Sequence, residues 1–145
     1  SNQMLTNLPA RIRMTTLYAV AQSEGIKGRV SNNCNRSENY VSYETKFGDG
    51  AGDFAPITNL TVREILAIGD YLGLPKELIH KTPIDGLNTN EDGSYVTDEQ
   101  SMGFSYNELD DYLLEGIKPD KEKLNKIEKM HVRGIAKNRM LAFNF

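Results

Sequence analysis

The residues best suited to chemistry lie in one glycine-rich stretch, residues 33–53. This stretch combines a glutamate, Glu38, and a lysine, Lys46, with two aspartates, Asp49 and Asp53, around glycines at every second position. Mg²⁺ favours such carboxylate oxygens and takes one or two of them together with phosphate oxygens. A lysine ammonium binds phosphate or carboxylate as a compact charge, and glycines let backbone N–H groups approach a ligand closely. The stretch therefore predicts a ligand-binding loop; the alternative is a surface loop rich in turn-forming Gly and Asp.

Helical segments must position this loop. Residues 6–25 place apolar side chains at helical spacing, between an N-cap at Thr6 or Asn7 and a stop at Gly25. Similar signals predict three more helices and one short helical turn: 61–73 capped by Thr61, the turn 76–80, 105–116 capped by Ser105, and a last helix opened by Asp120.

The remaining segments predict few strands and two long loops. Residues 26–30 alternate between apolar and polar side chains, which predicts one strand. Residues 31–56 predict a long ordered loop with a helical turn within 38–43, and residues 82–101 a second, mobile loop. One strand does not make a sheet. The chain is therefore either a small helical domain or the later part of an α/β fold whose other strands lie elsewhere.

Composition limits the function classes. The chain has 145 residues, 39% of them hydrophobic, and a formal net charge of −3, which indicates a globular protein without the basic surplus of a typical nucleic-acid binder. No apolar run is long enough to span a membrane, and no signal peptide is recognisable at the start of the chain. The single cysteine, Cys34, excludes an internal disulfide and fits a reducing cytoplasm.

Several motifs, in order along the chain, give a resemblance to a known family. The central stretch holds three motifs: Asn32-Asn33-Cys34-Asn35-Arg36-Ser37-Glu38, Thr45-Lys46-Phe47-Gly48-Asp49-Gly50 and Asp53-Phe54-Ala55-Pro56. They come after Asn7-Leu8-Pro9-Ala10-Arg11-Ile12-Arg13-Met14. Leu72-Gly73-Leu74-Pro75, Lys81-Thr82-Pro83 and Thr97-Asp98-Glu99 follow. In this order the motifs resemble those of the ammonia-dependent NAD synthetases, which are amide ligases of the ATP-pyrophosphatase type.

The resemblance implies a role for individual residues. Glu38 matches the glutamate that binds Mg²⁺ beside ATP, and Asn33 stands where a threonine contacts ATP. Four residues match contacts to the substrate deamido-NAD: Arg11, Lys46, Asp53 and Lys137. Asp49 is a separate hypothesis: an exposed carboxylate between glycines could hold ammonium for the reaction.

The sequence also departs from the family pattern. Ala136 replaces the histidine of a His-Lys pair, Val62 an ATP-contacting lysine, and Ile84 a threonine or serine. The family's Ser-Gly-Gly-x-Asp-Ser phosphate loop does not occur in this sequence. We therefore expect residues 1–145 to form a single partial domain, the C-terminal portion of such an enzyme. Its fold would be the later, mostly helical part of a Rossmann-like, doubly wound parallel sheet.

The resemblance implies amidation of deamido-NAD to NAD with ATP and ammonia through an acyl-adenylate. It also implies Mg²⁺ as cofactor. An apolar helix face left uncovered predicts a homodimer, and the charge balance and the lack of a long apolar run predict no nucleic-acid or membrane partner. Because the phosphate loop is missing from this sequence, we expect the isolated chain to be inactive. Two alternatives remain at this point. One is another ATP-pyrophosphatase-type ligase or thiolase, such as the GMP synthetase group, and the other is a non-enzymatic helical interaction module.

Overall fold

The computed structural model describes residues 2–139. Seven helices and two strands lie in this part of the chain: α1 (Asn2–Ala21), α2 (Arg36–Val41), α3 (Val62–Tyr71), α4 (Lys76–Ile79), β1 (Ile84–Thr89), β2 (Tyr95–Thr97), α5 (Asp98–Met102), α6 (Tyr106–Glu115) and α7 (Lys121–Asn138). None of these helices has the length and apolar character that crossing a membrane requires.

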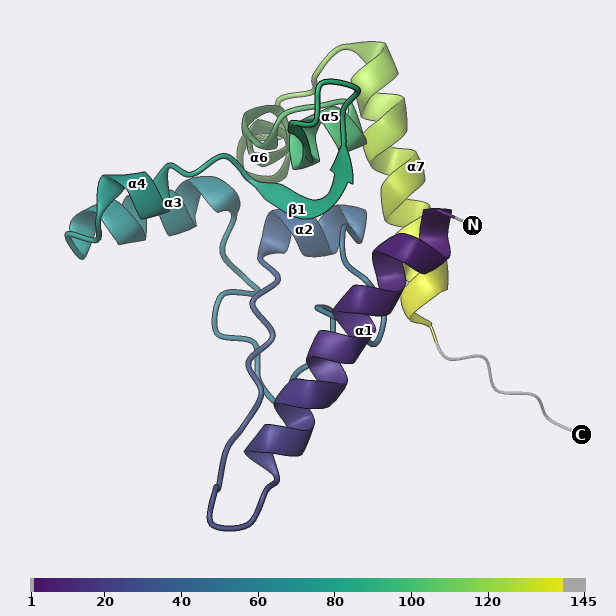
Figure 1. Cartoon of the computed structure of the whole chain (residues 1–145). Coiled ribbons are helices and arrows are strands. Elements are labelled where there is room, and N and C mark those ends of the chain that lie inside the picture. Colours follow the sequence, from purple (N-terminus) through teal and green to yellow (C-terminus); the bar gives the residue numbers. More distant parts are fainter. Residues whose placement is uncertain (1, 140–145) are drawn as a thin grey trace, which may run out of the picture.

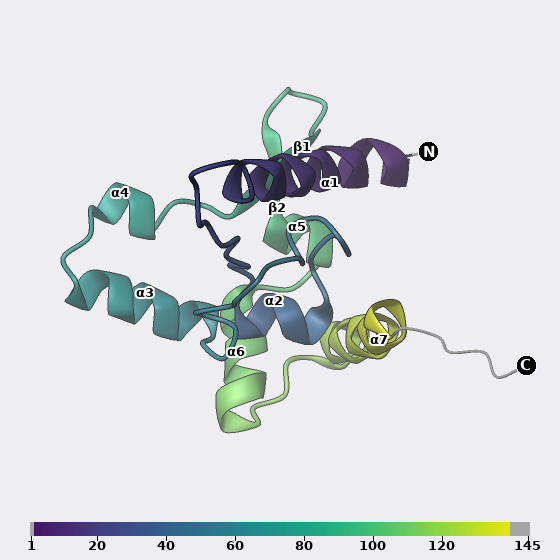
Figure 2. The same ribbon diagram turned by 90° about the horizontal axis from the view of Figure 1, so that it is seen from below.

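The apolar core is small and lies where α2, α5, α6 and α7 meet. It consists of six buried side chains: Val41, Met102, Phe104, Tyr106, Leu109 and Ile127. Around it, α1 runs past α2 and the β1–β2 hairpin, whereas α3 and α4 project as an arm (Figures 1 and 2). The core thus holds α2 and α7 together. The segment between α2 and α3 packs against α1, where Gly48 lies next to Ala10.

Three of the predicted helix starts are confirmed by their capping geometry. Thr61 and Ser105 each accept a hydrogen bond from the backbone N–H of a glutamate three residues on, and that glutamate bonds back to the cap. Asp120 caps α7 through the N–H of Lys123. Side-chain oxygens at these positions satisfy backbone donors that no helical carbonyl can reach, so the local sequence alone determines where these helices begin.

The start of the first helix was predicted wrongly. The prediction placed the N-cap at Thr6 or Asn7, but both residues lie within α1, which already runs from Asn2. Pro9 therefore lies inside the helix and leaves one helical hydrogen bond unmade. A proline keeps helical φ, so the helix can continue through this position at a cost in stability.

The predicted strand at residues 26–30 is also absent from the described structure. Its end instead meets the loop after Gly52: Asp53 donates its backbone N–H to the Val30 carbonyl at 2.7 Å, and Ser31 forms an isolated parallel bridge with Phe54. A Cβ on Gly52 would lie 2.5 Å from the Asn32 nitrogen, so only glycine allows this crossing. The alternation of apolar and polar side chains in residues 26–30 therefore accompanies a contact between two loops and not a strand of a sheet.

Residues 82–101 are more ordered than predicted. They form the antiparallel β1–β2 hairpin and then α5. The Asp92 carboxylate accepts hydrogen bonds from the Ser94 N–H and hydroxyl in the hairpin loop, and Thr97 with Gln100 forms the capping box that starts α5. The polar composition of this segment thus serves turn and cap hydrogen bonds.

Candidate functional site

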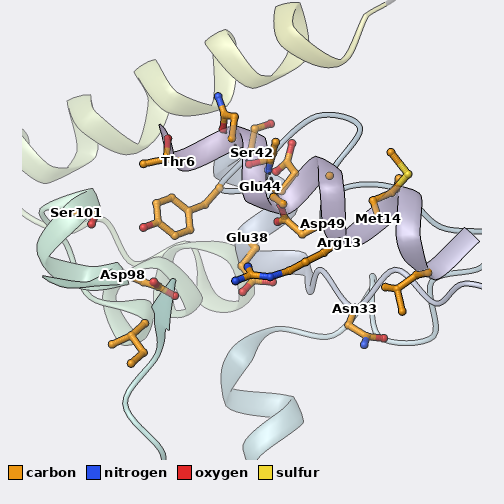
Figure 3. A pocket seen from close by; sticks show the side chains of 18 of the residues that line it. Thr6, Arg13, Met14, Asn33, Glu38, Ser42, Glu44, Asp49, Asp98 and Ser101 are labelled. Carbon is orange, nitrogen blue, oxygen red and sulfur yellow. Dashed lines mark hydrogen bonds between the residues drawn. The ribbon is translucent and has the colours of Figure 1, made fainter. Parts of the chain in front are cut away.

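A cavity of about 710 Å³ lies between α1 and the loop that follows α2 (Figure 3). Three of the predicted site residues line it: Asn33, Glu38 and Asp49. The other wall is one face of α1, from which Ala10 and Arg13 face the cavity. The structure therefore brings together the residues predicted for ATP, Mg²⁺ and ammonia.

The position of α1 over this loop depends on close packing at Gly48. A Cβ on Gly48 would lie 2.9 Å from the Ala10 Cβ, so a larger residue would push the helix away. Two hydrogen bonds add to this contact: the Thr45 hydroxyl donates to the Asn7 amide oxygen at 2.9 Å, and Arg11 Nε donates to the Lys46 carbonyl at 3.2 Å.

Glu38 has an unusual electrostatic environment for a carboxylate. It is the third residue of α2, where its Oε2 accepts the Asn35 backbone N–H at 2.9 Å. The pKa of Glu38 is raised to about 7, chiefly by burial and in addition by the nearby carboxylates of Asp98, Asp49 and Glu44, against the lowering effect of the Asn35 hydrogen bond. A bound cation would relieve this repulsion between carboxylates.

The donor set fits a Mg²⁺ ion that is shared with phosphate. Among residues 2–139, no group of three or more His, Cys, Asp or Glu side chains is arranged to hold a metal alone. Mg²⁺ commonly takes only one or two protein carboxylates and completes its coordination with substrate phosphates and water. Glu38 suits that mode of binding because it faces the cavity and gains from a cation nearby.

Lys46 lies in a second cavity of about 440 Å³. Its Nζ donates to the Lys137 carbonyl at 2.6 Å and lies 5.3 Å from the centre of the Phe47 ring. The two cavities share a wall, since Glu44 and Ala51 line both. The predicted substrate lysine is thus separated from the Glu38 cavity by only this wall.

The other predicted substrate contacts hold the loop itself. Arg11 is exposed and bonds to the Lys46 backbone, and Asp53 Oδ2 accepts the Val30 backbone N–H at 2.8 Å. The Lys137 ammonium donates to the carbonyl of Ser42 at 2.8 Å and to that of Glu44. These three side chains lie around the loop that carries Lys46, in contact with its backbone or its neighbours.

Sequence reasoning missed three charged residues of the first cavity. Arg13 extends from α1 toward Glu38, and Glu44 and Asp98 face the same space (Figure 3). The hydroxyl of buried Tyr106 donates to Asp98 Oδ2 at 3.3 Å. Arg13 could have been found from helical spacing, because it shares a face with Ala10; the other residues come together only through the tertiary fold.

Comparison with known proteins agrees with this description. The NH(3)-dependent NAD(+) synthetase of Alkaliphilus metalliredigens is 39% identical over 125 residues, which are 86% of this chain and 47% of that protein. The NMN synthetase structure from Francisella tularensis has a TM-score of 0.87 and 38% identity, and the match covers 100% of this chain and 58% of that one. An NH3-dependent NAD synthetase structure from Campylobacter jejuni has a TM-score of 0.64 and 26% identity, and this match covers 96% of this chain and 54% of that one.

The fold is therefore the Rossmann-like fold of the NAD and NMN synthetases, represented in the described residues by its mostly helical part. The family model described as NAD synthase matches residues 1–141, and the chain belongs to that family. The chain spans about half the length of the relatives it matches. That this half is the C-terminal portion of such an enzyme stays a prediction.

Proposed function

We propose that the protein carrying this chain is an amide ligase, which converts deamido-NAD to NAD with ATP and ammonia. The observation that carries the proposal is the shared wall between the two cavities. Asn33 and Glu38, predicted for ATP and Mg²⁺, line one cavity, and Lys46, predicted for deamido-NAD, lines the other. Activation of a carboxylate by ATP requires the two substrates to meet, and neighbouring cavities favour that meeting.

The chemistry follows from the poor reactivity of a carboxylate. Its oxygen attacks the α-phosphorus of ATP, pyrophosphate leaves, and the resulting acyl-adenylate is attacked by ammonia to give the amide and AMP. When bound, Mg²⁺ neutralises phosphate charge during the displacement. In this proposal Glu38 holds the ion, the Asn33 amide hydrogen-bonds ATP, and the Lys46 ammonium binds a phosphate or carboxylate of the substrate.

The remaining site residues of the proposal bind deamido-NAD near Lys46 or hold the ammonium ion. Arg11, Asp53 and Lys137 contact deamido-NAD or the loop that binds it, and their hydrogen bonds near that loop support this role. Asp49 holds ammonium at the first cavity. Its Oδ1 accepts the Thr45 N–H at 3.0 Å, which fixes the carboxylate beside the shared wall.

The proposal includes a homodimer and a cytoplasmic location. The dimer is supported by the outer face of α1, opposite the cavity, where Leu5, Leu8 and Ile12 are exposed. A second copy of this chain covering that face would remove this apolar surface from water. The lone cysteine, Cys34, supports a reducing compartment.

One observation favours a second candidate substrate, nicotinate mononucleotide. The NMN synthetase of Francisella tularensis matches the whole of this chain at the higher TM-score of 0.87, compared with 0.64 for the Campylobacter jejuni NAD synthetase. The mononucleotide carries the same nicotinate carboxylate, so the activation chemistry would be unchanged.

A substrate comparison tests the proposal. The full-length protein is assayed with ATP and ammonia against deamido-NAD and nicotinate mononucleotide, and kcat/KM is measured for each. We expect amide formation that requires all three substrates, and the ratio of the two kcat/KM values identifies the natural substrate. An absence of turnover with both would favour the helical interaction module. The isolated 145-residue chain is expected to make no NAD, and turnover by it would refute the prediction that it is incomplete.

A further inference from the structure

We infer that Glu44 is a positioning residue, which holds the Lys46 ammonium in the second cavity by fastening Lys137 to the segment after α2. The inference rests on the proposed function only where Lys46 is taken to bind substrate. The contacts that carry it involve α7 and residues 42–46, and they form one continuous series.

Glu44 is a buried carboxylate whose two oxygens differ in their contacts. Its side chain is only 5% exposed. Oε1 lies 3.1 Å from Lys137 Nζ and accepts the Asn138 amide at 3.1 Å, whereas Oε2 is buried and has no hydrogen-bond partner among the described residues. Burial of a partly satisfied carboxylate costs stability. The Lys137 ammonium is therefore the group that makes a charged Glu44 tolerable at this position.

The Lys137 ammonium is held by contacts to residues 42–44. It donates hydrogen bonds to the Ser42 carbonyl at 2.8 Å and to the Glu44 carbonyl, and it forms an ion pair with Glu44 Oε1 at 3.1 Å. The Lys137 side chain therefore ties the last turn of α7 to residues 42–44.

The backbone of Lys137 in turn holds Lys46. The Lys46 ammonium donates to the Lys137 carbonyl at 2.6 Å, and this carbonyl stays in place only while the end of α7 remains docked. A Cβ on Gly134 would collide with the Ser42 hydroxyl, so the close docking also requires glycine on α7. Glu44 therefore acts on Lys46 through Lys137.

Lysine acetylation of the folded chain tests this series without any assay of activity. Limited labelling with acetic anhydride, read by peptide mass spectrometry, gives the reactivity of Lys46 and Lys137 relative to Lys76, which is exposed on α4. In the Glu44→Gln variant we expect both lysines to react several-fold faster than in the parent chain, with Lys76 unchanged. A faster Lys137 with unchanged Lys46, or no change at either, would overturn the inference.

Two further measurements separate positioning from a purely structural role. If Glu44→Gln fails to fold by circular dichroism, Lys137→Met replaces it, since this variant loses the ammonium and keeps the carbonyl; faster Lys46 labelling supports the inference and unchanged labelling refutes it. In the full-length protein, Glu44→Gln should raise KM for the nicotinate substrate several-fold and by a larger factor than KM for ATP, and an equal or larger rise in KM for ATP would refute positioning. If the proposed function itself fails, the labelling result still shows whether Glu44 positions Lys46 through Lys137.

Discussion

At the scale of single residues, the first cavity is defined by carboxylates held close together. Glu38 is the centre of the group, because burial and the charges of Asp98, Asp49 and Glu44 all oppose its ionisation. Such perturbed groups gather where a ligand supplies the missing charge. Two consequences can be measured at single side chains.

The first concerns stability and pH. The pKa of Glu38 is raised from 4.5 to about 7 in the folded chain, so the folded state binds the proton more tightly than the unfolded state. Its contribution is fully present below about pH 4.5 and is lost as the pH rises to about 7, with an upper limit of roughly 3 kcal/mol. Urea unfolding at a series of pH values should show this decline in the parent chain and a smaller one in Glu38→Gln.

Added Mg²⁺ provides the matching control. Millimolar Mg²⁺ should stabilise the parent chain more at pH 8 than at pH 5, because the ion binds the ionised carboxylate. Glu38→Gln should lose this difference. Equal pH profiles for the two proteins would show that Glu38 does not titrate in this range.

The second consequence concerns Asp49. Asp49→Asn keeps an oxygen that can accept the Thr45 N–H but removes the charge that would hold ammonium. We expect the apparent KM for ammonia in the full-length protein to rise about tenfold, which corresponds to the loss of one charge-assisted hydrogen bond. Steady-state kinetics at saturating ATP measure this, and an unchanged ammonia KM would remove Asp49 from the ammonia step.

At the scale of the elements, one buried side chain joins three helices. Asp110 on α6 is fully buried; its carboxylate accepts the Ser37 hydroxyl of α2 at 2.5 Å and the Arg63 N–H of α3 at 2.8 Å. The Ser37 oxygen in turn accepts the Val62 N–H at 3.1 Å. The arm formed by α3 is thus attached to α2, which carries Glu38.

This tie predicts a large loss of stability in Asp110→Ala. The Ser37 hydroxyl and the Arg63 N–H would lose their acceptor inside the protein, at a cost of about 1–3 kcal/mol for each group. The neighbouring Asp111 is a matched control, since it pairs with Arg63 at the surface and Asp111→Ala should cost no more than about 1 kcal/mol. Similar urea midpoints for the two variants would contradict the proposed role of the buried tie.

The elements also show where sequence reasoning succeeds. Caps at Thr61, Ser105 and Asp120 were predictable because a local hydrogen bond determines each helix start. The strand predicted at 26–30 and the loop predicted at 82–101 failed for the opposite reason. Their structures depend on partners elsewhere in the chain, or on a hairpin whose short strands give a weak periodic signal.

The site residues also divide into those that local sequence predicts and those that depend on distant contacts. Asn33, Glu38 and Asp49 fall within the single glycine-rich stretch of residues 33–53, and the structure places all three at one cavity. Glu44 stands in the same loop but became notable only through its burial and its contact with Lys137 at the far end of the chain. Contacts between distant segments cannot be read from local spacing.

At the scale of the whole molecule, α1 has two faces with different tasks. One face lines the first cavity, and the other exposes a row of apolar side chains that includes Leu5, Leu8 and Ile12. A monomer gains nothing from that row. The molecule thus presents the surface that our proposed homodimer would bury.

Light scattering tests the dimer. The chain should elute as a dimer, and Ile12→Glu should shift it toward monomer by placing a charge in the apolar row. Tyr71→Glu changes an exposed aromatic residue on α3 and should leave the dimer intact. A monomeric parent chain at micromolar concentration would exclude the α1 interface.

The central claim is that this chain holds the nicotinate substrate through Lys46, and calorimetric titration with deamido-NAD tests it most directly. We expect saturable binding to the isolated chain without turnover. Lys46→Met should weaken it about 10- to 100-fold, the effect of removing one charge-assisted contact, and Lys76→Met should bind like the parent. Absence of binding, or equal affinity of Lys46→Met and the parent chain, would contradict the claim.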